Sequence, residues 1–335
     1  MKILVAPLNW GLGHASRCVP LIRRLLNEGH EVILGGDGES LTLLRKHFPK
    51  LRYTYLAPLN LRYSNGNRQV WAIAKALPKL VVWAMKDHMM LQALLREEHI
   101  DQVISDNRFG LYLNHKSPRL CRSSEITNHK CECVYMTHQL YIMLPKGWRW
   151  AEKIASRLHA RIYARFNKVW VPDYEEYEKS LAGELSHPKA FSIQHSAFRY
   201  IGPLSRFQNI PINPNTQNTP NYDVVAVLSG LEPHRTMLEK EIKARYQDSD
   251  KQVLVVQGLM NRPNTKMKRA NITTVPYLDD ETLAQALRNA RHIIARSGYS
   301  TIMDLEALGV MDKAELIPTP GQPEQEYLSL WVRRK

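Results

Sequence analysis

The chain has 335 residues, of which 44% are hydrophobic, 23% charged and 8% aromatic, and these ordinary values exclude a disordered or fibrous chain and a small disulfide scaffold. The length favours two domains. The formal net charge is +14, and residues 1–172 carry the whole excess, with 26 basic and 12 acidic residues, whereas residues 173–335 hold 20 of each. We therefore expect any anionic partner to meet the first half.

The N-terminal residues predict a strand, not an export signal. Residues 1–8 form a short apolar run with one lysine, which ends at Asn9. No apolar stretch reaches the roughly 18 residues that span a bilayer, and residues 77–85 are interrupted by Pro78 and Lys79. The chain has four cysteines, which fits a reducing compartment. The sequence thus predicts a cytoplasmic protein.

Strands and helices alternate along the first half, with a glycine-rich loop at residues 9–14. The predicted strands cover residues 3–6, 31–34, 102–105 and 133–137. The predicted helices cover residues 18–27 and about 83–98. This alternation is typical of βαβ units with a parallel sheet.

A segment rich in Pro, Asn, Gln and Thr, residues 203–221, separates this half from a second run of the same pattern. The strands predicted there cover residues 223–228, 253–257, 272–275, 293–295 and 315–318. The helices cover residues 233–246, 281–290 and 299–308. We expect two doubly wound α/β domains, 1–200 and 201–335, with ligands outside the carboxyl ends of their strands.

The glycine-rich loop opens the first helix at this ligand edge. Its glycines allow a ligand to approach the backbone, and His14 is placed to act on that ligand. As a dinucleotide fingerprint the loop is incomplete, because Ser16 replaces the third glycine, and nicotinamide binding is the weaker alternative. The candidate residues on this acceptor side are Gly11, Gly13, Asp106 and Asn107.

The turn Ser229-Gly230 precedes a helix with His234 and Arg235 in its first turn. Cations there cost roughly 0.3–1 kcal/mol each against the helix dipole, and a bound phosphate would reverse that cost. We predict a phosphate site at this turn. The alternative is that both side chains point into solvent.

Residues 295–309 run from a strand through the turn Ser297-Gly298 into a helix with the carboxylate of Asp304 one turn in. A strand and a loop of amides and acids, residues 320–327, follow. This order resembles the C-terminal part of nucleotide-sugar glycosyltransferases, in particular the MurG-type UDP-N-acetylglucosamine transferases of family 28. The resemblance implies the GT-B fold, in which two Rossmann-like domains face a cleft.

The resemblance also implies roles for single residues on the donor side. Residues 202–206 resemble an interdomain motif that places Arg206 near the uracil, and Leu278 matches the residue whose backbone meets the base. Asp304 stands where the family has a ribose-binding Glu, and Gln325 and Glu326 stand at a Gln-Gln pair that addresses the sugar. The donor-binding residues expected are Arg206, Ser229, Gly230, Leu278, Ser297, Gly298, Asp304, Gln325 and Glu326.

On the acceptor side, the resemblance places His14 in the cleft. The segment 137–139 resembles an acceptor-side His-Glu-Gln loosely, so the catalytic base is predicted to be His14 or His138. Members of the family continue past the position of Tyr327 with further helix. We therefore expect the last domain to be incomplete at its C-terminal end.

Two patterns come near to metal motifs without matching them. Cys121, His129, Cys131 and Cys133 lack the Cys-x2-Cys pairing of zinc sites, and we interpret them as loop thiols. Residues 248–250, Asp-Ser-Asp, fall at the sheet end opposite the ligand edge and predict a turn. We expect no metal and no other cofactor.

Residues 146–168 hold seven basic residues and one acid, Glu152. Basic residues at every fourth position form one ridge of a predicted helix, and apolar residues around Ile154 and Leu158 form the opposite stripe. Either the stripe packs on the sheet and the ridge is a solvated face, or the ridge is a membrane contact, since Trp with Lys and Arg suits anionic headgroups. Nucleic acid is the less favoured partner. The predicted membrane residues are Trp148, Arg149, Lys153, Arg157, Arg161 and Arg165.

Together these features predict a transferase that moves a hexosyl group, N-acetylglucosaminyl in the family it resembles, from a UDP-sugar to a lipid-linked or glycan acceptor of the cell envelope. We expect it to act without metal, with inversion, at the inner face of the cell membrane. Inversion is implied by the resemblance alone. The alternatives are a nucleotide-sugar epimerase on the same fold and an inactive or truncated paralogue that binds nucleotide or membrane.

Overall fold

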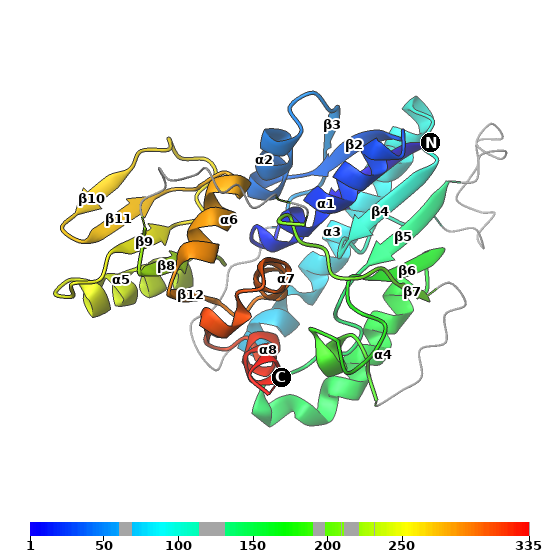
Figure 1. Cartoon of the computed structure of the whole chain (residues 1–335). Helices are drawn as coiled ribbons and strands as arrows, with labels where there is room; N and C mark the ends of the chain where they lie inside the picture. Colours follow the sequence, from blue (N-terminus) through cyan, green and yellow to red (C-terminus); the bar gives the residue numbers. More distant parts are fainter. Residues whose placement is uncertain are drawn as a thin grey trace.

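A computed structural model describes residues 1–59, 69–113, 131–189, 198–208, 210, 221–230 and 232–334. These residues form two α/β units, each built on its own sheet of mainly parallel strands (Figure 1). The predicted fold class is thereby confirmed. Each sheet lies within one of the two predicted domains, 1–200 and 201–335.

In the described part of the first half, seven parallel strands form one sheet. Their order is β3 (Tyr53–Tyr55), β2 (Glu31–Gly36), β1 (Lys2–Pro7), β4 (Gln102–Asp106), β5 (Glu132–Met136), β6 (Lys168–Val171) and β7 (Phe198–Tyr200). The strand order reverses between β1 and β4. In open α/β sheets ligands bind at such a switch point, outside the carboxyl ends of the strands.

Helices cover both faces of this sheet, as the alternation of side chains along β1 requires. Ile3 and Val5 pack in one buried cluster with α1 (Gly13–Asn27) and α2 (Gly38–His47). Leu4 and Ala6 pack in another, with Leu91 of α3 (Gln69–Glu97) and Tyr163 of α4 (Glu152–Tyr163). The α3 and α4 helices therefore share one face of the sheet.

Two predicted helices differ from the structure. The helix expected from about residue 83 begins at Gln69 and runs through Pro78, although a proline inside a helix removes one backbone hydrogen bond and clashes with the carbonyl four residues earlier. The basic segment starts as a 3-10 helix, η1 (Lys146–Ala151), before α4 begins.

The second sheet has the order β10 (Met267–Arg269), β11 (Ile272–Val275), β9 (Val253–Val256), β8 (Val224–Val227), β12 (His292–Arg296) and β13 (Ala314–Ile317). All pairs are parallel except β10 with β11, an antiparallel edge that the sequence analysis missed. The helices of this unit are α5 (His234–Tyr246), α6 (Asp280–Asn289), α7 (Tyr299–Leu308) and α8 (Pro323–Val332). Two short 3-10 turns, η2 (Gly183–Leu185) and η3 (Met311–Lys313), complete the described elements.

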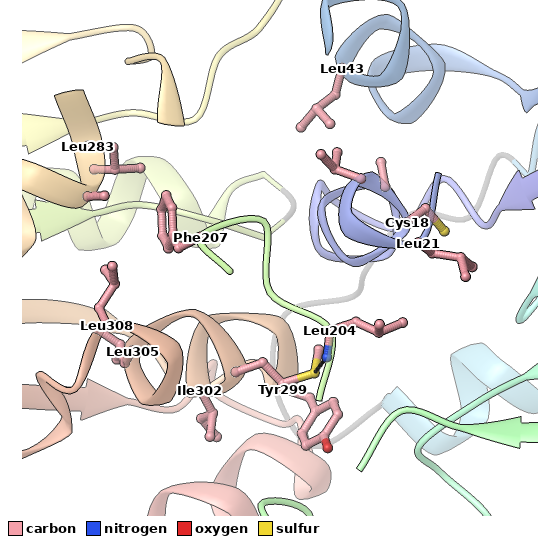
Figure 2. Close-up of a cluster of buried hydrophobic side chains, with 14 of the residues drawn as sticks. Cys18, Leu21, Leu43, Leu204, Phe207, Leu283, Tyr299, Ile302, Leu305 and Leu308 are labelled. Carbon is pink, nitrogen blue, oxygen red and sulfur yellow. Dashed lines mark hydrogen bonds between the residues drawn. The ribbon is translucent and has the colours of Figure 1, made fainter. Parts of the chain in front are cut away.

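The two units meet along an apolar junction in which α1 contacts α7. Figure 2 shows two residues of the connecting segment, Leu204 between Leu21 of α1 and Tyr299 of α7, and Phe207 near Leu283 of α6. All of them are buried in one cluster. The junction therefore joins the two units through a shared core.

Helix α8 lies against the first unit although it follows the second sheet. The Tyr327 hydroxyl accepts a 2.8 Å hydrogen bond from the backbone N–H of Glu184, and the Trp331 indole donates a 2.9 Å bond to the carbonyl of Ser180. Gly183 fits closely beneath both rings, since a Cβ there would come within 2.4 Å of the Tyr327 hydroxyl. The helix thus connects the second unit to the η2 region of the first.

Candidate active site

The glycine-rich loop after β1 faces two loops of the second unit. Gly11 has a φ of +74°, a conformation that favours glycine. A Cβ on Gly11 would lie 3.8 Å from Cα of Gly230, and a Cβ on Gly13 would lie 2.8 Å from Oγ of Ser300. Ser300 Oγ donates a 2.9 Å hydrogen bond to the Gly13 carbonyl. Sequence reasoning expected this loop at the cleft, and the structure places it there against α7.

His14 and Asp106 come together at the switch point. Asp106 ends β4 opposite Pro7 of β1, and its side chain is fully buried. The His14 ring, in the first turn of α1, places Nδ1 3.1 Å from Asp106 Oδ1. The neighbouring Asn107 accepts a 3.0 Å hydrogen bond from the Tyr135 hydroxyl. The acceptor-side residues predicted from sequence are therefore close together.

Arg17, which the sequence analysis did not single out, completes this cluster. Its Nε donates a 2.6 Å hydrogen bond to Asp106 Oδ2, and its NH2 group donates to Oδ1. Burial acts to raise the pKa of Asp106, but the positive charges of Arg17 and His14 outweigh it and hold that pKa well below its usual range. The carboxylate is therefore ionised at neutral pH.

His138, the other predicted base, is enclosed. Its Nδ1 lies 3.0 Å from Arg17 NH1 and its Nε2 2.8 Å from Glu324 Oε1. Because arginine can only donate, Nδ1 must accept, so Nε2 carries the proton and donates it to Glu324. The ring stacks on Tyr299 with centroids 4.2 Å apart and is 5% exposed. Burial lowers the pKa of His138, and Glu324 acts in the opposite direction. Because both ring nitrogens are already hydrogen-bonded, neither is free to take a proton from an acceptor.

Donor-side residues surround a small cavity of about 90 Å³ between the two units. Its lining includes Arg206, Ser229, Leu278 and Asp304, all predicted from sequence, together with Ser300, which was not. Arg206 and Leu278 also line a larger groove of about 870 Å³ that opens beside the cavity. The expected base, ribose and phosphate residues therefore lie along one continuous path.

Asp304 faces the connecting segment. Ser205 Oγ donates a 2.7 Å hydrogen bond to Asp304 Oδ1, and Arg206 Nε lies 3.4 Å from Oδ2. Burial raises the pKa of Asp304, and the charge of Arg206 acts against that rise. Arg206 also lies 3.5 Å from Asp280 Oδ1. The Asp304 carboxylate is thus already hydrogen-bonded to Ser205 and paired with Arg206, both in the segment that joins the domains.

The amide and acid loop before α8 is arranged differently from the expectation. Ser297 Oγ donates a 2.8 Å hydrogen bond to the carbonyl of Gln325, whose side-chain oxygen accepts a 2.8 Å bond from the Thr319 N–H. A Cβ on Gly298 would lie 4.0 Å from Gln325 Nε2. Glu326 is exposed, whereas Glu324 points to His138. Sequence reasoning missed Glu324. The signal that could have found it is Pro323, because proline favours the first position of a helix and so places Glu324 in the first turn.

The first turn of α5 does not need a phosphate to offset its charges. Glu232 Oε2 accepts a 3.2 Å hydrogen bond from the Thr236 N–H, and Glu232 Oε1 lies 2.9 Å from Arg235 NH2. His234 is buried, and its carbonyl accepts a 2.9 Å bond from Arg296. The charge argument from sequence was therefore wrong, because it overlooked Glu232. Helix α7 begins at the cavity without a side-chain cap.

The ridge of cations on α4 is exposed, but the predicted apolar stripe is not buried. Ile154 and Leu158 are each more than half exposed, and Trp150 is 70% exposed beside Trp148, with ring centroids 6.0 Å apart. The buried face instead carries Ser156, His159 and Tyr163. His159 Nε2 lies 2.9 Å from the Tyr135 hydroxyl, and burial lowers the pKa of His159 to about 4. Cations and apolar side chains therefore share one surface.

Within the described ranges, no group of three or more His, Cys, Asp or Glu side chains could hold a metal ion. Cys131 and Cys133 are buried, and the expectation of loop thiols is wrong for Cys133, which lies within β5; Cys121 and His129 lie outside the described residues. Among the helices that the structure describes, none is long and apolar enough to cross a bilayer.

No family model matches the chain. An uncharacterized glycosyltransferase of Methanosarcina acetivorans is 24% identical over 331 residues, which cover 97% of this chain and 82% of that protein. An uncharacterized glycosyltransferase of Methanosarcina mazei is 22% identical over 340 residues, with the same coverage.

Solved structures resemble the chain over nearly its whole length. UGT2 of Phytolacca americana, in complex with UDP-2-fluoro-glucose and pterostilbene, has a TM-score of 0.55 and 13% identity, and the match covers 99% of this chain and 83% of that one. The spinosyn rhamnosyltransferase SpnG, in complex with thymidine diphosphate, has a TM-score of 0.56 and 12% identity, with 99% and 84% covered. The chain has the GT-B fold. With its curated relatives, this fold identifies the chain as a glycosyltransferase.

Proposed function

We propose that this glycosyltransferase moves a hexosyl group from a UDP-sugar to a membrane-associated or glycan acceptor, without a metal and with inversion at the anomeric carbon. The observation that supports this proposal most directly is the His14–Asp106 pair in the cleft, opposite the first turn of α7, which has no side-chain cap. N-acetylglucosamine as the sugar and family 28 as the lineage follow from the MurG-type resemblance. A cell-envelope glycan is then the product.

In this mechanism His14 is the base. His14 Nδ1 lies 3.1 Å from Asp106 Oδ1 and 2.9 Å from Arg17 NH2, and in the tautomer that we propose its Nδ1–H donates to Asp106, so the acceptor hydroxyl gives its proton to Nε2. The acceptor oxygen forms a bond to the anomeric carbon while the bond from that carbon to the diphosphate breaks, and the electron pair leaves with the diphosphate. We assign the stabilisation of the departing charge to the Ser229 loop and to the N–H groups at the start of α7.

The donor class draws support from two sources. The cavity brings Arg206, Leu278 and Asp304 together, the three residues that the resemblance assigns to the nucleoside. The solved neighbours named above bind UDP and thymidine diphosphate compounds. A nucleoside diphosphate sugar therefore suits this site, and UDP is our proposal for its nucleotide.

A UDP-release assay tests the proposal. Thermal shift against UDP, GDP, TDP and their sugars first selects the donor, because a ligand stabilises the fold according to its occupancy. With that donor, we expect UDP release to rise severalfold on adding a detergent-solubilised membrane-lipid fraction. Interconversion of the sugar without UDP release would instead support the epimerase. If no nucleotide shifts the unfolding midpoint, the inactive-paralogue alternative takes the place of our proposal.

We further propose that the enzyme works as a peripheral protein at the inner face of the cell membrane. The α3 helix has an exposed apolar stripe at every fourth residue, Leu77, Val81, Met85 and Met89. The η1 turn before α4 adds the exposed Trp150, and the exposed face of α4 adds Ile154 and Leu158 between its cations. Tyr112 links the two helices, since it stacks on His88 of α3 and accepts a 3.0 Å bond from Arg165, which follows α4. The two helices together offer an apolar surface with a basic border, which suits anionic lipid.

Vesicle flotation checks this surface. Each cation at an anionic membrane contributes about 1 kcal/mol, so replacing Lys153, Arg157 and Arg161 together with glutamine should weaken partitioning roughly 100-fold. The measurement uses phosphatidylcholine vesicles with and without phosphatidylglycerol. A matched control replaces three exposed cations of the second unit, Lys266, Lys268 and Arg269, with glutamine. Equal flotation of both triple variants would rule out α4 as the membrane contact.

A further inference from the structure

The guanidinium of Arg17 lies at the centre of the acceptor-side cluster. Arg17 is 1% exposed, although it stands only one turn after His14 in α1. Its Nε and NH2 groups bind both oxygens of Asp106, its NH2 lies 2.9 Å from His14 Nδ1, and its NH1 lies 3.0 Å from His138 Nδ1. A single buried guanidinium therefore contacts the proposed base, His14, and two polar groups beside it, Asp106 and His138.

The two hydrogen bonds from Arg17 determine how Asp106 can accept a hydrogen bond from His14. A bidentate guanidinium fixes the plane of a carboxylate as well as its charge. With both Asp106 oxygens held, Oδ1 stays 3.1 Å from His14 Nδ1. In the tautomer that proton transfer at Nε2 requires, Nδ1–H donates to Oδ1, and Arg17 NH2, 2.9 Å from Nδ1, donates to Asp106 and not to His14. A carboxylate free to rotate would hold the imidazole ring less firmly.

Arg17 also connects this pair to the second unit. Its NH1 donates to Nδ1 of His138, whose Nε2–H donates to Glu324 in the first turn of α8. Glu324 is adjacent to Gln325, whose carbonyl accepts from Ser297 at the donor-side turn. A continuous chain of hydrogen bonds thus runs from His14 through Asp106, Arg17 and His138 to the donor domain.

We propose that Arg17 is a positioning residue for glycosyl transfer, which holds both oxygens of the Asp106 carboxylate and thereby fixes its position beside His14. The inference rests on the proposed function, because it assumes that His14 is the base. It adds a residue that touches neither donor nor acceptor but sets the geometry of the group that takes the proton.

The charged groups around Asp106 give this role a pH signature. Asp106 is faced by Arg17, His14 and Cys18 of α1, by Tyr135 of β5 and, through Arg17, by His138 and Glu324. Burial raises the pKa of Asp106, and Arg17 is the strongest charge acting against it. Without Arg17 the carboxyl takes up a proton at a higher pH and can then no longer accept from Nδ1.

The test compares Arg17→Lys and Arg17→Met with Arg24→Met, an exposed arginine of the same helix. UDP release from UDP-N-acetylglucosamine is followed with water or the lipid fraction as the nucleophile. We expect Arg17→Met to lower kcat about 100-fold with donor KM within about threefold, and to move the acid limb of the kcat profile to higher pH. Arg17→Lys, which keeps the charge but not the fork, should recover part of kcat and most of the pH profile. Arg24→Met should match the wild type.

A buried carboxylate left without its partner can prevent folding, so Arg17→Met is paired with Arg17→Met/Asp106→Asn, which removes both charges. The double variant should fold and be no slower than Asp106→Asn alone, because the two residues act as a unit. Wild-type kcat and an unmoved acid limb in folded Arg17→Lys and Arg17→Met would overturn the inference, and so would a double variant much slower than Asp106→Asn. If His14→Ala keeps full activity, the proposed role of His14 as the base is wrong. That result differs from one in which His14→Ala loses activity and the Arg17 variants do not, which would overturn only the inference about Arg17.

Discussion

Replacing His14 with alanine should lower kcat for glycosyl transfer about 1,000-fold while donor binding stays within a few fold. The reason is that a positioned general base contributes roughly 10² to 10⁴ in rate, and His14 is the histidine whose Nε2 is left available once Nδ1 is engaged with Asp106. The residues that we propose to contact the nucleotide, Arg206 and Leu278, line the cavity between the two units. Steady-state UDP release gives kcat and KM, and thermal shift with UDP gives donor binding.

His30→Ala is the matched control, because His30 lies just beyond α1, where its Nε2 is 3.5 Å from Glu28 Oε2 and away from the cleft. It should retain wild-type kcat. His138→Gln separates the two predicted bases. Glutamine keeps one donor and one acceptor for Glu324 and Arg17, so this variant should lose far less activity than His14→Ala. The reverse ranking would transfer the role of base to His138.

Much of the fold was predictable because it depends on local patterns. Short buried apolar runs that end in glycine or a polar residue define parallel strands, and the ends of β1, β4 and β8 place Gly11, Asp106 and Ser229 at ligand edges. These positions need no knowledge of distant contacts. The residues of the donor cavity could be anticipated from the resemblance, which adds spacing information that one sequence lacks.

Partners that are far apart in sequence explain what was missed. Arg17 binds Asp106 at a separation of 89 residues, and nothing near Arg17 distinguishes it from the other cations of α1. In α4, two of the buried positions, Ser156 and His159, are polar because each finds a hydrogen-bond partner outside the helix. Ser156 accepts a 2.9 Å bond from the Ile142 N–H, and His159 bonds Tyr135. A pattern of apolar residues therefore selected the wrong face of this helix.

Contacts between residues that are far apart in the sequence also give the largest stability effect that we expect, at Arg108. This fully buried guanidinium donates to both oxygens of Asp87, at 2.9 and 2.8 Å, to Asp37 at 2.9 Å and to the carbonyl of Ala57 at 2.6 Å. It thereby holds the end of β2 and the residues after β3 against α3. Arg108→Met should lower the free energy of unfolding by about 3–5 kcal/mol, because it leaves buried carboxylates uncompensated. Urea unfolding at neutral pH measures the loss.

Arg52→Met is the appropriate comparison, because Arg52 also pairs with a carboxylate, Glu98, but is 63% exposed, and it should cost less than about 1 kcal/mol. The deficit of Arg108→Met should also depend on pH. Burial already raises the pKa of Asp87 against the opposing pull of Arg108, so removing Arg108 raises it further. A raised folded-state pKa in an acid means that the penalty is full above that pKa and shrinks as the pH falls through it. A deficit that stays constant from pH 8 to pH 5, or one no larger than that of Arg52→Met, would show that this buried network does not carry the stability assigned to it.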